Sequence, residues 1–364
     1  MINFDDRLKS LKDRRQGTTE SSLLEKSSHF GGENYLLLEK YEQLNVDHAI
    51  KYVIGAMAPV SADYTQISKE EGERVATRLI ELLRSSGISA EKRMQGSVAL
   101  DIHIEGHSDV DMLILKTLQR PALSRTNYRD ANDARLMVNI IRELRVHSEQ
   151  KLQSIYHAAD VNIIRGDKSI SLSGGSLKRK VDIVPAGWYD THEYQRTYEQ
   201  HFRAVNIYDK SKHVLIENKP FLHIKKVNDR DFGCGGNLKK VARLMKNIIA
   251  DMPPHKKDKA KKLTSYDIAG IAYAMNLNLY CSKHFPLVLL ENLRSYLLNL
   301  CYSDELRNSL IVPDETRRIF DSNEKVEAVK ILYAEVHELA KSIQRSINPY
   351  QTTYNGSVLK NKQV

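Results

Sequence analysis

Two aspartates separated by one residue, Asp109 and Asp111, lie at the start of an apolar run that continues to Leu115. Side chains at positions i and i+2 of a strand point to the same face, so the two carboxylates would lie side by side. Two like charges at this range are costly in a partly dry cleft unless a cation compensates them. Mg²⁺ prefers hard oxygen ligands of this kind. The pair therefore predicts a divalent-metal site.

A third carboxylate could complete such a site. Asp182 lies in the segment KRKVDIVPA, residues 178–186, on a predicted strand that could lie beside the first. In phosphoryl transfer, paired metal ions hold a triphosphate, stabilise the leaving pyrophosphate and activate the attacking hydroxyl. We expect Asp109 and Asp111 to bridge both ions. Asp182 would hold the ion beside the acceptor hydroxyl and help to remove its proton.

The alternative is that these acids cap strand ends at a solvated edge, which is the usual explanation of an isolated Asp-x-Asp. The pair Gly96-Ser97, whose serine precedes Asp109 by twelve positions, favours the metal site. Glycine lets the backbone approach a phosphate closely, exposed N–H groups donate to its oxygens, and the Ser97 hydroxyl adds a donor. Together with Asp182, this pair predicts the phosphate and metal end of a nucleotidyl-transfer site.

The elements that would position these residues fall into two groups. Apolar periodicity predicts helices over residues 34–57, 68–87 and 130–156, and strands over 91–95, 109–115, 159–166, 168–173 and 178–186. This mixture is typical of a small α/β lobe. Helical periodicity then dominates residues 236–252, 265–277, 287–303 and 323–347, which should pack as a helical lobe. The lysine-rich segment 251–262 between the first two of these helices is expected to be a charged loop.

The expected fold is therefore of the α+β class, with a mixed sheet, a C-terminal helical lobe and a cleft between them. We expect four segments: a flexible N-terminal segment with the start of a helix at 1–45, a catalytic core at 46–230, the helical lobe at 231–348 and a mobile polar tail at 349–364.

Composition narrows the class of ligand and the compartment. The chain has 55 Lys and Arg against 46 Asp and Glu, and this excess of +9 favours polyanionic ligands such as nucleoside triphosphates or nucleic acid. Cys234, Cys281 and Cys301 form no Cys-x-x-Cys pair, so a disulfide framework or an all-cysteine zinc site is not expected. There is no apolar signal core and no long apolar run, which predicts a cytoplasmic protein with no membrane association.

The order of these motifs resembles a known family. One series of motifs is similar to the nucleotidyltransferase core of the DNA polymerase β superfamily: Gly-Ser, a spacer, HSDVDMLIL and then VDIVPA. The later segments GNLKKVARLMKNI and TSYDIAGIAYA resemble the cGAS/DncV-like nucleotidyltransferases, or CD-NTases, which include bacterial SMODS enzymes. The resemblance spans residues 45 to 345. It implies a polymerase-β-like core with the helical lobe packed beside it.

The resemblance also implies roles for individual residues. The metal ligands of the family fall on Asp109, Asp111 and Asp182, and its phosphate-binding Gly-Ser falls on Gly96 and Ser97.

Three further positions in the helical lobe match nucleotide-binding residues of the family. Lys246 matches a lysine that contacts the triphosphate, Ser265 a hydroxyl that binds phosphate, and Tyr266 a ring that stacks on a base. A helix start and an aromatic face suit these tasks on physical grounds as well. The alternatives are that Lys246 is an exposed cation on a basic helix and that Tyr266 only packs the lobe.

The activity implied by the resemblance is the joining of nucleoside triphosphates into a cyclic di- or trinucleotide, with ATP expected as one substrate and the second base left open. It would use two Mg²⁺ ions, with Mn²⁺ as the alternative. The product would be read by a separate effector protein in antiphage defence, and the resemblance leaves room for a regulatory protein partner. Alternatives are an RNA nucleotide-adding polymerase, an aminoglycoside nucleotidyltransferase, or an inactive module that senses nucleotides or RNA.

Two features depart from the family pattern. The spacer VALDIHIEGH, residues 98–107, replaces the small polar or Gly-Thr element that follows Gly-Ser in many relatives. His107 in this spacer could touch a nucleotide, although a solvated loop histidine is the commoner explanation. No His and Cys cluster in the helical lobe matches the zinc ribbon of the animal enzyme, so DNA sensing by that route is not expected.

Overall fold

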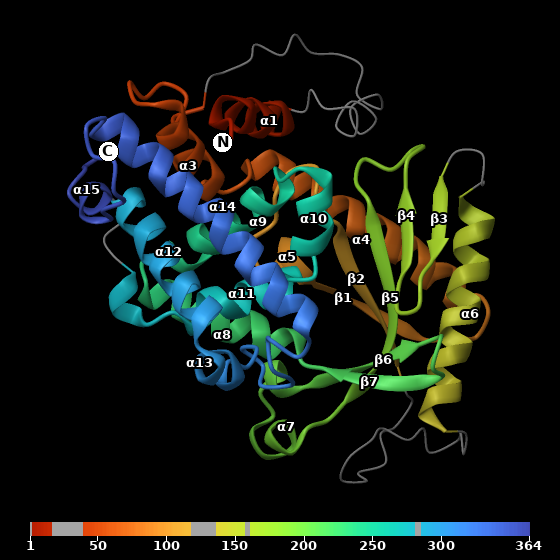
Figure 1. Ribbon diagram of the computed structural model, residues 1–364. Helices are drawn as coiled ribbons and strands as arrows, with labels where there is room; N and C mark the ends of the chain where they lie inside the picture. Colours follow the sequence, from red (N-terminus) through yellow and green to blue (C-terminus); the bar gives the residue numbers. More distant parts are fainter. Residues whose placement is uncertain (1, 17–38, 118–135, 157–160, 281–284) are drawn as a thin grey trace.

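The protein has a sheet-containing lobe and a helical lobe (Figure 1). The computed structural model describes residues 2–16, 39–117, 136–156, 161–280 and 285–364. The strands are β1 (Ala90–Gln95), β2 (Val110–Lys116), β3 (Asn162–Arg165), β4 (Ile170–Ser173), β5 (Val181–Tyr189), β6 (Ala204–Asp209) and β7 (Val214–Asn218). They form a mixed sheet in the order β1-β2-β5-β4-β3, and β6 pairs with both β5 and β7. Strands β2 and β5 are parallel, whereas the remaining pairs are antiparallel.

The alternation of side chains along β2 fixes which face carries the acids. Met112 and Ile114 point into the cluster beneath α4 (Ala62–Arg84) and α6 (Met137–Ile155). Leu113 and Leu115 point the other way, towards a smaller cluster with Trp188. Because Asp111 has the parity of Leu113, its carboxylate lies on the face opposite α4 and α6. The sheet-containing lobe also contains α5 (Gly96–Ala99), α7 (His192–Thr197) and η1 (Gln200–Phe202).

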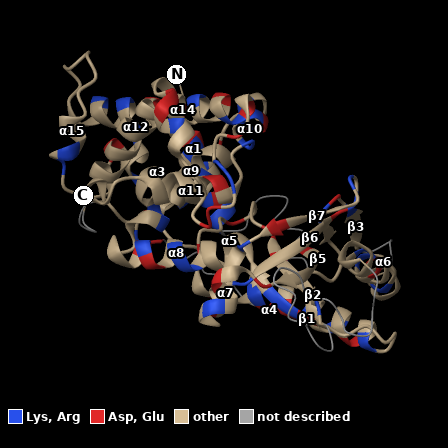
Figure 2. Ribbon diagram, turned by 90° about the horizontal axis from the view of Figure 1, so that it is seen from below, with Lys and Arg blue, Asp and Glu red and all other residues tan. Residues whose placement is uncertain are grey.

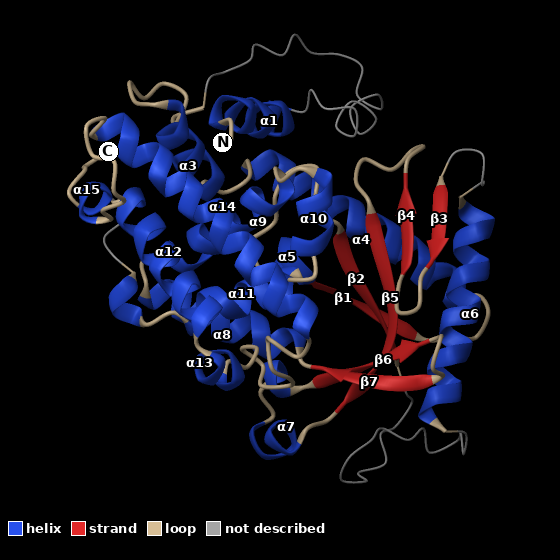
Figure 3. Cartoon of the chain, viewed as in Figure 1, coloured by secondary structure: helices blue, strands red, loops and turns tan. Residues whose placement is uncertain are grey.

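The helical lobe contains the largest apolar cluster of the described chain. Figure 3 shows its helices gathered beside the sheet. They are α1 (Phe4–Gln16), α3 (His48–Met57), α8 (Pro220–Gly233), α9 (Asn237–Ala250), α10 (Pro254–Ala260), α11 (Ser265–Ala274), η2 (Leu277–Leu279), α12 (Pro286–Tyr302), α13 (Asp304–Ser309), α14 (Asn323–Ile347) and α15 (Ser357–Lys360). Helix α9 is central, because twelve of its 14 residues are buried. Basic and acidic residues are interspersed along α8 and α14 (Figure 2). None of the described helices is both long and apolar enough to cross a membrane.

Parts of both ends of the chain, which were expected to be flexible, pack against the helical lobe, and residues 17–38 lie outside the described residues. Helix α1 buries Leu8 and Leu11 in the helical lobe, and Arg7 on it forms an ion pair of 2.7 Å with Glu335 of α14. At the other end, Leu359 is fully buried and the Tyr354 hydroxyl donates to Glu291. Both ends are held because a few apolar residues within polar segments find partners on distant helices. Sequence periodicity over such short stretches does not reveal these partners.

Several other boundaries differ from expectation. Helix α3 begins at His48 after its cap Asp47 and packs on α9, so this part of the expected core belongs to the helical lobe. The expected start of that helix at residues 34–38 lies outside the described residues. The hairpin β6–β7 was not expected. The charged segment at 251–262, expected as a loop, contains the helix α10.

Candidate functional site

The three aspartates meet where β2 and β5 run side by side. Asp109 immediately precedes β2, and the register pairs the Cα of Asp111 directly with that of Asp182 on the parallel strand β5. Burial, together with the charges of Asp182 and Asp109, raises the pKa of Asp111 to about 7. The pKa of Asp109 is also raised by burial, against the opposing effect of a neighbouring lysine. The site therefore holds mutually repelling acids close together.

Two side chains that the sequence analysis did not single out contact these acids. The Lys180 ammonium donates to Asp109 Oδ2 over 2.6 Å, and the Ser171 hydroxyl of β4 donates to Asp182 Oδ1. Within the described ranges, no group of three or more His, Cys, Asp or Glu side chains is arranged to hold a metal ion. The donor set nevertheless fits a hard divalent cation in its chemistry, because all three donors are carboxylates and their charges repel. The position of Lys180, two residues before Asp182, was the available sequence signal.

Gly96 allows the phosphate-binding element to approach the acids. It links β1 to α5 with φ +76°, in the left-handed region that favours glycine. A Cβ atom added to Gly96 would overlap the Asp111 carboxylate. Ser97 follows it, largely buried, at the wall of a cavity. The structure thus brings the predicted Gly-Ser element against the predicted metal-binding acids.

The cavity next to these residues measures about 350 Å³ and is shared by the two lobes. It is lined by Gln95, Gly96, Ser97, Leu100, Ile102, His107, Ser108, Asp109, Asp111, Asn218, Pro220, His223, Ile224, Thr264, Ser265 and Tyr266. Asp182 adjoins this wall through its pairing with Asp111. Residues from β1, β2, α8 and α11 therefore meet at one cavity, as a two-lobed substrate site requires.

Lys246 is a buried cation, not an exposed one. It lies on the central helix α9 with 7% of its surface exposed, and its ammonium donates to the Ser108 hydroxyl over 3.1 Å. Burial lowers the pKa of Lys246 to about 7, although the charges of Asp111 and Asp109 act in the opposite direction. The alternative of a merely exposed lysine is therefore wrong. Through Ser108, which lines the cavity, Lys246 reaches the edge of the acid cluster.

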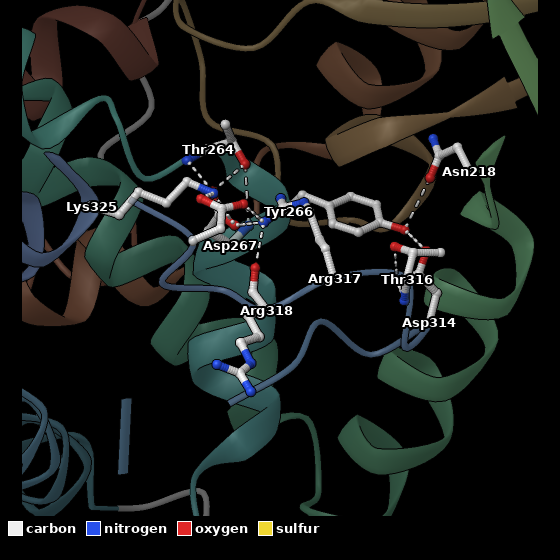
Figure 4. Close-up of polar contacts among 10 residues, drawn as sticks. Asn218, Thr264, Tyr266, Asp267, Asp314, Thr316, Arg317, Arg318 and Lys325 are labelled. Carbon is white, nitrogen blue, oxygen red and sulfur yellow. Dashed lines mark hydrogen bonds and ion pairs between the residues drawn. The ribbon is translucent and has the colours of Figure 1, made fainter. Parts of the chain in front are cut away.

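Ser265 and Tyr266 begin α11 at the opposite wall. Thr264 caps the helix in a capping box with Asp267, which leaves Ser265 as the first helical residue, facing the cavity. The Tyr266 hydroxyl donates to Asp314 over 2.6 Å, and its ring stacks on His223 with centroids 3.7 Å apart. Figure 4 shows this hydroxyl directed at Asn218 and Asp314. Tyr266 thus both packs the lobe and borders the cavity.

The loop before α14 braces this helix start. Asp267, which is fully buried, forms ion pairs with Arg317 at 2.7 Å and with Lys325 at 3.2 Å (Figure 4). Asp314, also fully buried, accepts from the Thr316 hydroxyl as well as from Tyr266. The sequence analysis missed both aspartates. Only the folded lobe shows that Asp314, 48 residues beyond Tyr266, fixes its orientation.

The two histidines of the spacer have different environments. His103 is buried, its Nε2 lies 3.0 Å from the Thr65 hydroxyl, and burial lowers its pKa to about 4. His107 is exposed and borders the cavity. Of the two histidines in this spacer, His107 therefore lies where it could contact a nucleotide, and His103 does not.

The arrangement is the one expected of a nucleotidyltransferase. It combines a mixed sheet, acids where the parallel strands β2 and β5 meet, and a helical lobe. Residues 225–343 match the model of the cGAS/DncV-like nucleotidyltransferase C-terminal helical domain. The cyclic dinucleotide synthase CdnE of Yersinia aleksiciae is 36% identical over 372 residues, which cover 96% of this chain and 95% of the relative. A c-di-GMP synthase of Capnocytophaga granulosa is 30% identical over 330 residues, covering 81% of this chain and 88% of the relative.

A solved structure agrees with these sequence matches. The STING-associated CdnE c-di-GMP synthase from Capnocytophaga granulosa superposes with a TM-score of 0.72 at 28% identity, covering 94% of this chain and 99% of that one. The chain therefore belongs to the cGAS/DncV-like nucleotidyltransferases. The predicted family, α+β fold and nucleotidyltransferase activity of the cyclic-oligonucleotide-synthase type are confirmed. Enzymes of this family use divalent metal ions.

The first prediction concerns Gly96. Gly96→Ala should lower nucleotidyl transfer by at least about 100-fold, because a misplacement of reacting groups by an ångström has effects of this size. The new methyl group must displace the Asp111 carboxylate or the backbone beside it. Gly233→Ala is the matched control, since an added Cβ there meets no atom within 4 Å. Equal activity of the two variants in a pyrophosphate-release assay would contradict the proposed close approach.

The second prediction concerns the hydrogen bond between Tyr266 and Asp314. Tyr266→Phe should lower the free energy of unfolding by about 1–3 kcal/mol, because a buried acceptor loses its donor. Urea unfolding of Tyr266→Phe, Asp314→Ala and the double variant should give a coupling energy of about 0.5–3 kcal/mol, as expected for groups in contact. Strictly additive effects would show that the hydroxyl does not depend on this carboxylate.

The third prediction concerns pH. The folded-state pKa of Asp111 is about 7 and its ordinary value is 3.8, so metal-free protein should lose stability as pH rises between these values. Asp111→Asn removes this loss. With EDTA, its gain in unfolding free energy over wild type should be larger at pH 8 than at pH 5 by about 1–2 kcal/mol, allowing for solvent screening. A gain that does not change with pH in urea unfolding would contradict the raised pKa of Asp111, which burial and the neighbouring acids cause.

Proposed function

We propose that this enzyme joins two nucleoside triphosphates into a cyclic dinucleotide and releases one pyrophosphate at each bond formed. The single observation that supports this most strongly is the register of Asp111 with Asp182, beside Gly96, at a cavity shared by both lobes. At each step a ribose hydroxyl oxygen bonds to an α-phosphorus, and the bond from that phosphorus to the bridging oxygen of the pyrophosphate breaks. The hydroxyl proton passes to a base.

We propose that Asp109, Asp111 and Asp182 hold the divalent metal. Two Mg²⁺ ions, with Mn²⁺ as the alternative, would neutralise charge on the triphosphate and lower the pKa of the attacking hydroxyl. Asp182 is the acid held by Ser171 on the neighbouring strand, which fixes the direction of its carboxylate. We assign Asp182 to the acceptor side, where it helps to remove the hydroxyl proton.

The remaining walls would bind the substrate. Gly96 and Ser97 would offer the phosphates a close backbone and a hydroxyl donor. Lys246 supplies a positive charge behind Ser108, and Ser265 supplies a hydroxyl from the opposite lobe. Tyr266, held in place by Asp314 and His223, would offer an aromatic surface to a base.

The relatives suggest which nucleotides to test first. Three relatives are c-di-GMP synthases, so GTP joins ATP as a candidate substrate. We propose that the cyclic product is read by a separate effector protein in antiphage defence, by analogy with the STING-associated relative. The reaction would take place in the cytoplasm, where nucleoside triphosphates are available. We also propose, by analogy with the family, that a regulatory protein binds this enzyme.

The experiment that tests this function is product analysis. Purified full-length protein is incubated with ATP, GTP, CTP and UTP and Mg²⁺, treated with phosphatase, and analysed by mass spectrometry. We expect a phosphatase-resistant cyclic dinucleotide, reduced by at least about 100-fold in Asp182→Asn, since metal-bound charge contributes several kcal/mol to such reactions. Asp63→Asn, an exposed change in the first turn of α4, is the matched control and should retain wild-type yield.

Each other outcome would contradict a distinct part of the proposal. A ladder of linear products would favour a polymerase over a cyclase. Equal yields from Asp182→Asn and Asp63→Asn would remove Asp182 from the reaction. Recovery of nucleosides alone from wild type, at every combination of triphosphates, would contradict the synthase activity.

A further inference from the structure

Lys180 contacts one of the three acids but has no part in the proposed reaction. Lys180 immediately precedes β5, and its ammonium lies 2.6 Å from Asp109 Oδ2. Its backbone carbonyl accepts from the N–H of Val110, so the segment carrying Lys180 is tied to the start of β2. The lysine is therefore held beside the first of the three acids by the pairing of the two strands.

We propose that Lys180 is a built-in counter-ion that holds the Asp109 carboxylate in the metal-free enzyme and that a divalent cation must displace. This inference rests on the proposed function, because it takes the three aspartates as the metal ligands. Lys180 acts through Asp109 and is thus a positioning residue. It would keep the acid cluster folded without metal and would set how strongly the metal must bind to capture Asp109.

Charge balance supports this role. Three carboxylates converge on the site, and the nearby ammonium groups are those of Lys180 and Lys246. Lys246 is buried on a central helix and donates to Ser108, so it is fixed. Lys180, in contrast, directly contacts one of the acids.

Exposure and chain flexibility also support it. The Lys180 side chain is 40% exposed and that of Asp109 is 36% exposed, so both have room to separate. A lysine is a compact point charge on a flexible four-carbon stem, and it can leave a carboxylate without disturbing the backbone. A partly exposed ion pair of this kind contributes only about 0.2–1 kcal/mol, which a dication held by three carboxylates exceeds. The contact is therefore strong enough to orient Asp109 and weak enough to be displaced.

The arrangement of Asp109 agrees with this reading. Asp109 lies just before β2, and its carboxylate is bonded to Lys180. Asp111 and Asp182, in contrast, are already paired in register on adjacent strands. When a divalent cation binds, the Asp109 carboxylate would therefore exchange its contact with Lys180 for one with the metal.

The test is Mn²⁺ binding to full-length protein stripped with EDTA and then freed of chelator, with free Mn²⁺ followed by electron paramagnetic resonance. Lys180→Met should bind Mn²⁺ about two- to fivefold more tightly, which corresponds to the free energy of the ion pair it removes. In EDTA its melting temperature should fall below that of wild type, and saturating Mn²⁺ should close this gap. Lys180→Arg retains the charge and should resemble wild type in both measurements.

Two controls separate the causes. Lys178→Met removes the same charge two residues away and should leave Mn²⁺ affinity near the wild-type value, which excludes a general effect of net charge. Asp182→Asn should abolish Mn²⁺ binding over the range titrated. Equal or weaker Mn²⁺ binding by Lys180→Met, with Asp182→Asn still defective, would overturn the counter-ion role alone. Mn²⁺ binding that is absent in wild type, or unchanged in Asp182→Asn, would overturn the proposed metal site and this inference together.

Discussion

The repulsion between carboxylates on two parallel strands is the constraint on which the site depends. Strand pairing places Asp111 opposite Asp182, and apolar residues on the same strands drive that pairing through burial. Burial is the main cause of the raised pKa of Asp111, and the charges of Asp182 and Asp109 raise it further. Apolar packing of the sheet therefore holds these like charges together, and a divalent cation bound there would relieve their repulsion.

The same constraint explains why the cavity is shared between lobes. The sheet supplies the acids and Gly96, whereas Lys246 comes from the central helix of the other lobe. Apolar burial around α9 fixes that lysine near the acids, whereas a surface lysine would remain in water. Both lobes are therefore needed to balance charge around a substrate that is itself highly anionic.

Features set by neighbouring residues in the sequence could be predicted, whereas features set by contacts between distant residues could not. The apolar run that begins beside Asp109 and Asp111 predicted the strand β2, because such patterning is local. Helical periodicity predicted the helical lobe for the same reason. Helix α1 and the hairpin β6–β7 were not predicted, because their positions depend on partners hundreds or tens of residues away. The roles of Lys180 and Asp314 were missed for the same reason: each is defined by one contact that only the tertiary fold creates.

Tyr266 shows that a residue can pack the lobe and also border the cavity. The sequence analysis treated packing and binding as alternatives, yet the ring is stacked on His223, its hydroxyl is bonded to Asp314, and it still borders the cavity. A side chain immobilised in this way loses little conformational entropy when a base stacks on it. Rigid packing of Tyr266 would therefore favour binding of a base. Asp314, which is buried and does not line the cavity, contributes by fixing the orientation of Tyr266.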